Sequence, residues 1–281
     1  MTQPARFGAR LADAMAEHGP LCAGIDPHPE LLRAWGLPVD ASGVEQFALR
    51  CVEALTGEVA VLKPQSAFFE SHGSAGVAAL ERTLAAARDA GTLVLLDAKR
   101  GDIGSTMEGY AAAYLVDGAP LAADAITLSP YLGMGALTPA FDAAAQHGRG
   151  LFLLARTSNP DGVAVQSAEF EGRSVAQSIV DAAAGHNAEA TPLGDIGVVV
   201  GATTEHGLDL ATLNGPVLAP GFGSQGATPS DLPKLFRQAA RSVLPAVSRE
   251  LLRHGPDPSS LRSGARRLQD AFARALDGHD R

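Results

Sequence analysis

Eight short runs of β-branched and aliphatic residues recur along the chain, and turn-forming residues bound each of them. The runs occupy positions 21–25, 59–63, 92–96, 124–128, 151–155, 196–200, 216–220 and 243–247. Ala- and Leu-rich stretches with a helical spacing of apolar residues separate most of these runs. Such alternation is typical of parallel βα units. The pattern therefore predicts an α/β protein with eight strands, a single (β/α)8 TIM barrel.

The chain ends and one irregular segment complete the predicted organisation. Residues 7–19 predict an N-terminal helix that closes the lower mouth of the barrel, and residues 260–278 predict the eighth outer helix. Residues 156–172 are longer than an ordinary βα connection, and we expect them to form a loop on the active face. No interior linker interrupts the pattern, so we expect one barrel domain over residues 1–281.

Composition narrows the class of protein. With 46% hydrophobic and 19% charged residues, the chain is expected to be globular rather than disordered. A net charge of −9 argues against broad attraction to nucleic acid or an anionic membrane, but it allows a small anionic ligand. The sequence carries neither a signal-peptide core nor an apolar run of about 18 residues. Cys22 and Cys51 lack CxxC spacing, which favours buried thiols in a reducing, cytoplasmic setting.

Lysine is rare in this chain. Of 22 basic residues only Lys63, Lys99 and Lys234 are lysines. A lysine can release its proton, whereas an arginine cannot do so at neutral pH. Lys63 ends the second predicted strand and Lys99 follows the third, so both are candidates for proton chemistry. The alternative is that they are incidental in an arginine-rich composition.

Charged residues lie at or just after the carboxyl end of each of the first three predicted strands. Asp26 follows the first strand, Lys63 ends the second, and Asp97, Lys99 and Asp102 follow the third. Functional side chains of a barrel lie at the carboxyl ends of its strands. The two-residue period of a strand would place Asp97 and Lys99 on the same side. A lone D-x-K is more often a solvated turn, and Asp26 could equally be a turn residue, but the combination favours one shared pocket.

The segment LVLLDAKRGDIGSTM resembles the signature of orotidine 5′-phosphate decarboxylases, an apolar strand followed by D-x-K-x-x-D-I-[GP]-x-T. Its fixed positions are filled by Asp97, Lys99, Asp102, Ile103, Gly104 and Thr106. The resemblance extends to LCAGIDPHP, VLKPQSAFFE, TLSPYLG, PGFGSQG and AVSRELL. It is closest to the stand-alone bacterial branch called type 2.

The resemblance implies decarboxylation of orotidine 5′-phosphate to uridine 5′-phosphate (UMP), the last step of de novo pyrimidine nucleotide synthesis. It implies an alternating array of Lys63, Asp97, Lys99 and Asp102, with Asp102 supplied by the neighbouring subunit of a homodimer. Loss of CO2 leaves an in-plane carbanion on C6, and no cofactor is expected to act as an electron sink. Fixed positive charge must then stabilise the carbanion. Lys99 is the implied proton donor to C6.

Further residues receive roles from the same resemblance. Asp26 and Lys63 would hold the ribose hydroxyls, and Ser129 would bind the pyrimidine edge, although an isolated Ser before Pro is more often a turn residue. Residues around Ile103 and Thr106 would enter the partner's active site. We expect a capping box, Ser105 to Glu108, at the start of the following helix. Pocket residues without assigned roles are Arg156, Thr157 and Asn159.

Residues 220–226 follow the seventh strand and formally match the dinucleotide motif G-x-G-x-x-G. That motif expects an acidic residue after the next strand, but the next strand here ends at Ser248-Arg249. A glycine loop and an arginine instead suit the phosphate site of a barrel. The resemblance assigns Gln225 and Arg249 to the phosphate. Ala227 departs from the family, which usually has glycine there.

Two alternatives remain. A magnesium-dependent 3-keto-6-phosphogluconate decarboxylase shares D-x-K-x-x-D, but it has a metal-binding glutamate where this chain has Lys63, whose charge would repel Mg²⁺. A non-catalytic barrel that binds sugar phosphates would need the glycine loop and Arg249 but not the Lys–Asp array. The eight histidines show no HExxH or HxH spacing, so no metal site is expected.

Overall fold

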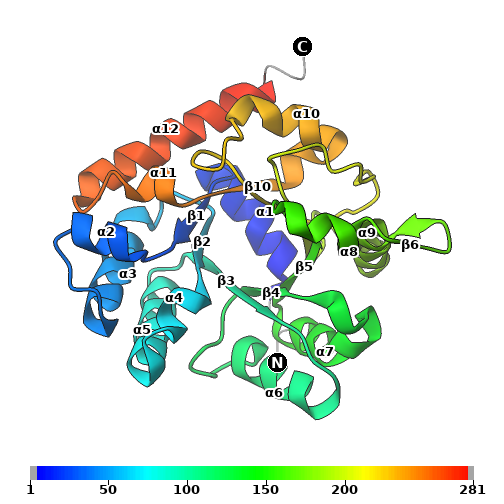
Figure 1. Cartoon of the computed structure of the whole chain (residues 1–281), viewed down its shortest axis with the longest axis horizontal. Helices are drawn as coiled ribbons and strands as arrows, with labels where there is room; N and C mark the ends of the chain where they lie inside the picture. The colour runs from blue at the N-terminus through cyan, green and yellow to red at the C-terminus, as the bar shows by residue number, and fades with distance from the viewer. Residues whose placement is uncertain (1–4, 278–281) are drawn as a thin grey trace.

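The computed structural model describes residues 5–277, and its eight main strands form a closed parallel barrel (Figure 1). Around the barrel the strand order is β1-β2-β3-β4-β5-β8-β9-β10. Their bounds are β1 Cys22–Ile25, β2 Val61–Pro64, β3 Leu93–Arg100, β4 Ala125–Leu128, β5 Gly150–Arg156, β8 Ile196–Val200, β9 Val217–Pro220 and β10 Val243–Val247. Each of the eight predicted runs overlaps one of these strands, and β2, β3 and β5 extend beyond their runs. The predicted fold class is confirmed.

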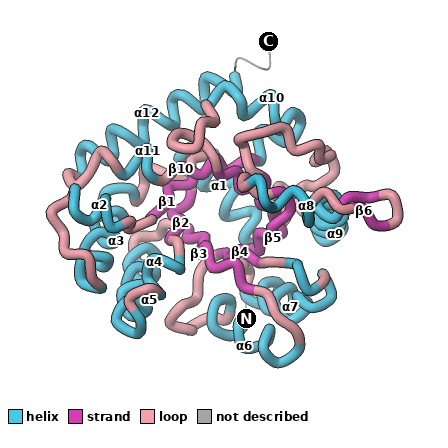
Figure 2. Tube along the Cα trace, viewed as in Figure 1, coloured by secondary structure: helices cyan, strands magenta, loops and turns pink. Residues whose placement is uncertain are grey.

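The longer helices other than α1 surround the strands (Figure 2). The α-helices are α1 Phe7–His18, α2 Pro29–Ala34, α3 Ala41–Leu55, α4 Ser66–Glu70, α5 Gly73–Asp89, α6 Gly104–Leu115, α7 Thr138–His147, α8 Val163–Gln166, α9 Val175–Asn187, α10 Leu232–Phe236, α11 Arg249–Leu252 and α12 Pro258–Asp277. Five 3₁₀ segments are η1 Pro130–Leu132, η2 Met134–Leu137, η3 Pro160–Gly162, η4 Pro229–Asp231 and η5 Arg237–Ser242. The predicted eighth outer helix corresponds to α12, and its expected last residue, 278, lies outside the described residues. No helix within residues 5–277 has the length and apolar character needed to cross a membrane.

Helix α1 lies across one mouth of the barrel and fills it with apolar side chains. Phe7 and Leu11 are fully buried and belong to the same core cluster as Phe152 of β5. The rings of Phe7 and Phe152 meet edge to face with centroids 6.0 Å apart. A Cβ at Gly150 would lie 2.2 Å from the Phe7 ring, which explains the glycine at the start of β5. The opposite mouth, at the carboxyl ends of the strands, is left for a ligand.

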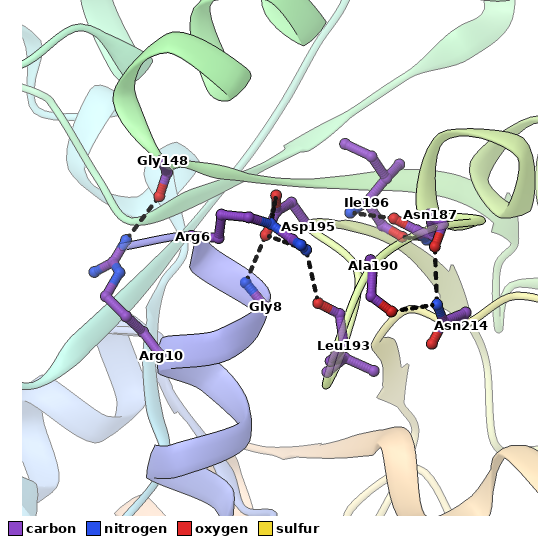
Figure 3. Close-up of polar contacts among 10 residues, drawn as sticks. All are labelled: Arg6, Gly8, Arg10, Gly148, Asn187, Ala190, Leu193, Asp195, Ile196 and Asn214. Atoms are coloured by element: carbon purple, nitrogen blue, oxygen red, sulfur yellow. Dashed lines mark hydrogen bonds and ion pairs between the residues drawn. The ribbon is translucent and has the colours of Figure 1, made fainter. Parts of the chain in front are cut away.

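Polar contacts fix the start of α1 against the loop that precedes β8 (Figure 3). Asp195 accepts hydrogen bonds from Arg6 Nε at 3.0 Å and from the Gly8 N–H at 2.7 Å. Arg10 donates to the carbonyl of Gly148 at 2.9 Å. The two bonds to Asp195 join segments nearly 190 residues apart, and the Arg10 bond joins residues 138 apart. The closing helix is therefore anchored to the barrel by specific contacts as well as by apolar burial.

One segment is more regular than predicted, and one local prediction was wrong. Residues 156–172 are not simply an irregular loop, because they contain η3, α8 and strand β6 (Glu169–Phe170), which pairs with β7 (Arg173–Ser174). Glu171 and Gly172 both have positive φ, as a tight hairpin turn requires. The expected capping box at Ser105 does not form: the N-cap of α6 is Ile103, two residues earlier, and it makes no side-chain hydrogen bond.

Candidate active site

A cavity of about 480 Å³ opens at the carboxyl ends of the strands, and all eight barrel strands contribute to its lining. Its apolar walls include Leu154, Val199 and Leu218. Its polar groups come mainly from β2 and β3 on one side and from the loops after β9 and β10 on the other. An apolar cavity with a few convergent polar groups is the usual form of a small-molecule site.

Asp97 is the centre of the polar groups on the β2–β4 side. Its Oδ1 accepts hydrogen bonds from Lys99 Nζ at 2.6 Å and from Thr127 Oγ1 at 2.8 Å. Its Oδ2 accepts from Lys63 Nζ at 3.3 Å and from Gln65 Nε2 at 2.9 Å. Four donors therefore share two oxygens, and the carboxylate cannot rotate without losing several bonds. The structure brings together three members of the expected array, Lys63, Asp97 and Lys99.

Electrostatics keep this cluster charged. Burial opposes ionisation of Asp97, but Lys63 and Lys99 outweigh it and lower the pKa of the carboxyl to about 2. Burial also opposes the charged form of Lys63, yet Asp97 and Asp26 raise the pKa of this ammonium above its ordinary value. At neutral pH the buried pair is thus an ammonium and a carboxylate.

Lys99 reaches the cavity from a distorted part of β3. Its φ of 46° lies in the left-handed region, which non-glycine residues rarely adopt. The ladder with β4 pairs Leu96 with Ile126 and Arg100 with Leu128, so β3 carries two extra residues there. The Lys99 side chain is 45% exposed and lies between Asp97 and the open cavity. The same-side placement expected for Asp97 and Lys99 is therefore met through a bulge rather than through a regular strand.

Asp102, Ile103 and Thr106 do not line the cavity of this chain. Asp102 is half-buried and accepts a hydrogen bond from the Ile103 N–H at 2.8 Å. Ile103 is 61% exposed, and Tyr131 and Leu132 of η1 are also exposed. The fourth expected member of the array is thus separate from the other three, and its neighbour Ile103 is exposed.

The expected phosphate residues, Gln225 and Arg249, both line the cavity. The loop after β9 is tight, because Gly223 N–H donates to the Ala227 carbonyl at 2.9 Å and Ala227 N–H to the Gly221 carbonyl at 3.1 Å. Ala227 is buried in the core, so its replacement of the family's usual glycine leaves the loop closed. Within residues 5–277 the exposed Arg249 guanidinium has no ion-pair partner, which leaves its donors free for an anion.

The structure does not bring Ser129 to the cavity; its N–H donates to the Arg100 carbonyl at 2.8 Å. Another serine, Ser158 in the segment after β5, lines the cavity, and its hydroxyl lies 3.3 Å from Gln225 Oε1. Its neighbours Thr157 and Asn159 also line the cavity, whereas Arg156 does not and binds Gln166 instead. The signal for Ser158 was its place two residues after the end of the fifth strand.

Sequence reasoning also missed Gln65 and Thr127, the two neutral donors to Asp97. Gln65 could have been found from its position two residues after Lys63, on the same side of an extended chain. Two polar atoms of the lining, Asp26 Oδ1 and Ser248 Oγ, are buried without a hydrogen-bond partner among the described residues. Such atoms favour a polar ligand at this position.

Within the described part of the chain, no group of three or more His, Cys, Asp or Glu side chains could hold a metal ion.

Comparisons with known proteins agree with this geometry. The family model described as "Orotidine 5'-phosphate decarboxylase / HUMPS family" matches residues 19–263. The orotidine 5′-phosphate decarboxylase of Salinispora arenicola is 58% identical over 274 residues, which cover 97% of this chain and 99% of that protein. The corresponding protein of Streptomyces coelicolor is 58% identical over 267 residues, 93% of this chain and 95% of the relative.

Solved structures show the same similarity. A crystal structure of a Streptomyces avermitilis protein assigned to this decarboxylase activity has a TM-score of 0.95 and 54% identity, and the match covers 98% of both chains. The Leishmania donovani OMP decarboxylase has a TM-score of 0.75 at 29% identity, covering 96% of this chain and 98% of that one.

Proposed function

The chain belongs to the orotidine 5′-phosphate decarboxylase / HUMPS family. We propose that it converts orotidine 5′-phosphate to UMP and CO2 at the cluster around Asp97. It is thereby a carboxy-lyase of pyrimidine nucleotide synthesis. The observation that carries the proposal is the Lys99 ammonium, held 2.6 Å from Asp97 Oδ1 at the open side of the cavity.

The reaction breaks the bond between C6 and the carboxylate, and the electron pair stays on C6. Lys99 places a positive charge where this negative charge develops, and it then donates its proton to C6. The products are CO2, UMP and a neutral lysine that regains its proton from solvent. Asp97 carries a full negative charge beside the substrate carboxylate, and their repulsion falls as CO2 leaves.

Lys63 favours this reaction over that of the magnesium-dependent relatives. Its ammonium is buried against Asp97 and stays charged, so this position offers a cation where those enzymes place a metal-binding glutamate. We therefore propose a reaction without metal or cofactor.

Substrate contacts follow from the lining. The phosphate binds at Gln225 and Arg249, and the ribose hydroxyls bind at Asp26 and Lys63. Ser158 takes the contact to the pyrimidine edge, because its hydroxyl faces the cavity beside Gln225 and that of Ser129 does not.

We further propose a homodimer in which Asp102 completes the partner's array, since Asp102 lies outside the cavity of its own chain. Exposed Ile103, Tyr131 and Leu132 would supply apolar surface to this interface, and Thr106 would approach the partner's substrate. In this proposal residues 5–277 belong to one barrel domain, and the ends of the predicted domain, residues 1–4 and 278–281, lie outside the described residues. The buried free thiols Cys22 and Cys51 suit a cytoplasmic location.

The central experiment is release of labelled CO2 from carboxyl-labelled orotidine 5′-phosphate by the purified protein. We expect turnover that is unchanged by EDTA. Absence of CO2 release would refute the decarboxylase assignment, and loss of activity in EDTA would refute the metal-free mechanism.

A mixing experiment tests Asp102 separately. Lys99→Ala and Asp102→Ala variants should each be inactive, but dimers mixed from the two contain one site with both native residues. Random mixing therefore restores about one quarter of the wild-type activity. If Asp102 acted within its own chain, the mixture would be no more active than its parents.

A further inference from the structure

Thr127 of β4 contacts both reactive residues of β3 at once. It is 1% exposed, its hydroxyl donates to Asp97 Oδ1 at 2.8 Å, and the same oxygen accepts the Lys99 N–H at 2.9 Å. We infer that Thr127 is a positioning residue whose hydroxyl holds the Lys99 backbone and the Asp97 carboxylate in their reactive arrangement. The inference rests on the proposed decarboxylation.

The distorted ladder between β3 and β4 explains why a side chain is needed here. Leu96 pairs with Ile126 and Arg100 with Leu128, so residues 97–99 of β3 all lie opposite the single residue Thr127. The left-handed φ of Lys99 removes its N–H from the regular ladder. The Thr127 hydroxyl accepts this N–H in place of a strand carbonyl, so the bulge keeps its hydrogen bond.

The chemistry of the contact selects a hydroxyl. One oxygen must accept from a backbone N–H and donate to a carboxylate in the same geometry, which a hydroxyl can do. The β-branch of threonine also restricts rotation about χ1, so the hydroxyl keeps its direction. Valine has nearly the same shape but would leave the Lys99 N–H and one Asp97 acceptor position without a partner. Serine retains both hydrogen bonds.

These differences define the test. We expect Thr127→Val to lower kcat for orotidine 5′-phosphate by about 10- to 100-fold, since a small displacement of a reacting group has a large effect on rate. KM and the Kd for UMP should stay within about threefold, because the phosphate contacts are untouched. Thr127→Ser should keep kcat within about threefold of wild type, since the hydroxyl remains.

Thr83→Val is the matched control. Thr83 of α5 is also 1% exposed, and its hydroxyl donates to the Ala79 carbonyl at 2.8 Å, away from the cavity. Its loss should lower the melting temperature but leave kcat unchanged.

Several outcomes would overturn the inference. A Thr127→Val enzyme within twofold of the wild-type kcat would do so, as would a Thr127→Ser enzyme as slow as Thr127→Val, because the methyl group would then be the essential part. If Thr127→Val does not fold, Thr127→Ala is judged by the same thresholds. Failure of the wild-type enzyme to release CO2 would instead refute the proposed function.

Discussion

The two sides of the cavity differ in how their polar groups are satisfied. On the β2–β4 side, Asp97 accepts four hydrogen bonds, two of which come from the ammonium groups of Lys63 and Lys99. On the β9–β10 side, Arg249 has no ion-pair partner within residues 5–277, and Ser248 Oγ has no hydrogen-bond partner there. One side is complete before a ligand binds, whereas the other offers donors to a ligand.

Burial accounts for the difference. A buried charge is unfavourable unless it is paired, so Lys63 and Asp97 must bind one another in the folded chain. Arg249 lies at the exposed rim, where water satisfies it at little cost. In the proposed mechanism, the first side supplies fixed charge to the transition state, and the second supplies binding energy from the phosphate.

The largest effect on activity is expected from a substitution on the β2–β4 side. Lys99→Ala should lower kcat by at least about 10⁴-fold, because the variant loses both the cation and the proton donor. UMP should still bind, since Gln225 and Arg249 remain. Lys234→Ala, which removes an exposed lysine of α10, is the control and should be fully active. Unchanged turnover in steady-state assays of Lys99→Ala would mean that the array is not the reactive centre.

On the β9–β10 side, the effect of a substitution on activity should depend on whether the substrate carries a phosphate. Arg249→Ala should lower kcat/KM for orotidine 5′-phosphate by about 10²- to 10³-fold, in line with loss of two charge-assisted hydrogen bonds. The same variant should act on orotidine, which lacks the phosphate, as well as wild type does. An equal loss on both substrates would show that Arg249 acts on the reacting carbon rather than on the phosphate.

Acid unfolding should report the pairing of Asp97. Its pKa is about 2 in the folded chain against an ordinary 3.8, so its contribution to stability is present above pH 4 and is lost as the pH falls toward 2. This part of the unfolding free energy is on the order of 2 kcal/mol. Denaturant titrations between pH 5 and 2 should show a shallower decline in Asp97→Asn. Parallel curves for the two proteins would contradict the lowered pKa.

The smallest expected effect on kcat/KM is that of Ser158→Ala, and its comparison with Ser129→Ala shows which serine binds the substrate. Ser158→Ala should lower kcat/KM by about tenfold, the equivalent of one lost hydrogen bond to the substrate. Ser129→Ala should stay within twofold, because Ser129 does not line the cavity. Steady-state assays of both variants decide the matter, and the reverse ranking would restore Ser129 as the base-binding residue.

The local sequence pattern was sufficient to predict most of the barrel. Each strand is a short apolar run between turn residues, and this signal does not depend on any other part of the chain. The array residues Lys63, Asp97 and Lys99 were recognisable because rare lysines follow consecutive strands within a dense motif. The phosphate loop was recognisable from its glycines.

The tertiary structure decided which neighbours complete the site. Thr127, Gln65 and Ser158 are ordinary polar residues near strand ends, and their importance arises from groups on other segments of the chain. The bulge that turns Lys99 over Asp97 depends on the register between β3 and β4, which no single segment encodes. Ser129 and Ser158 carry the same hydroxyl at the ends of adjacent strands, and only closure of the barrel determines which one faces the cavity. Side-chain type is a property of one position, whereas direction and hydrogen-bond partner are set by packing between strands.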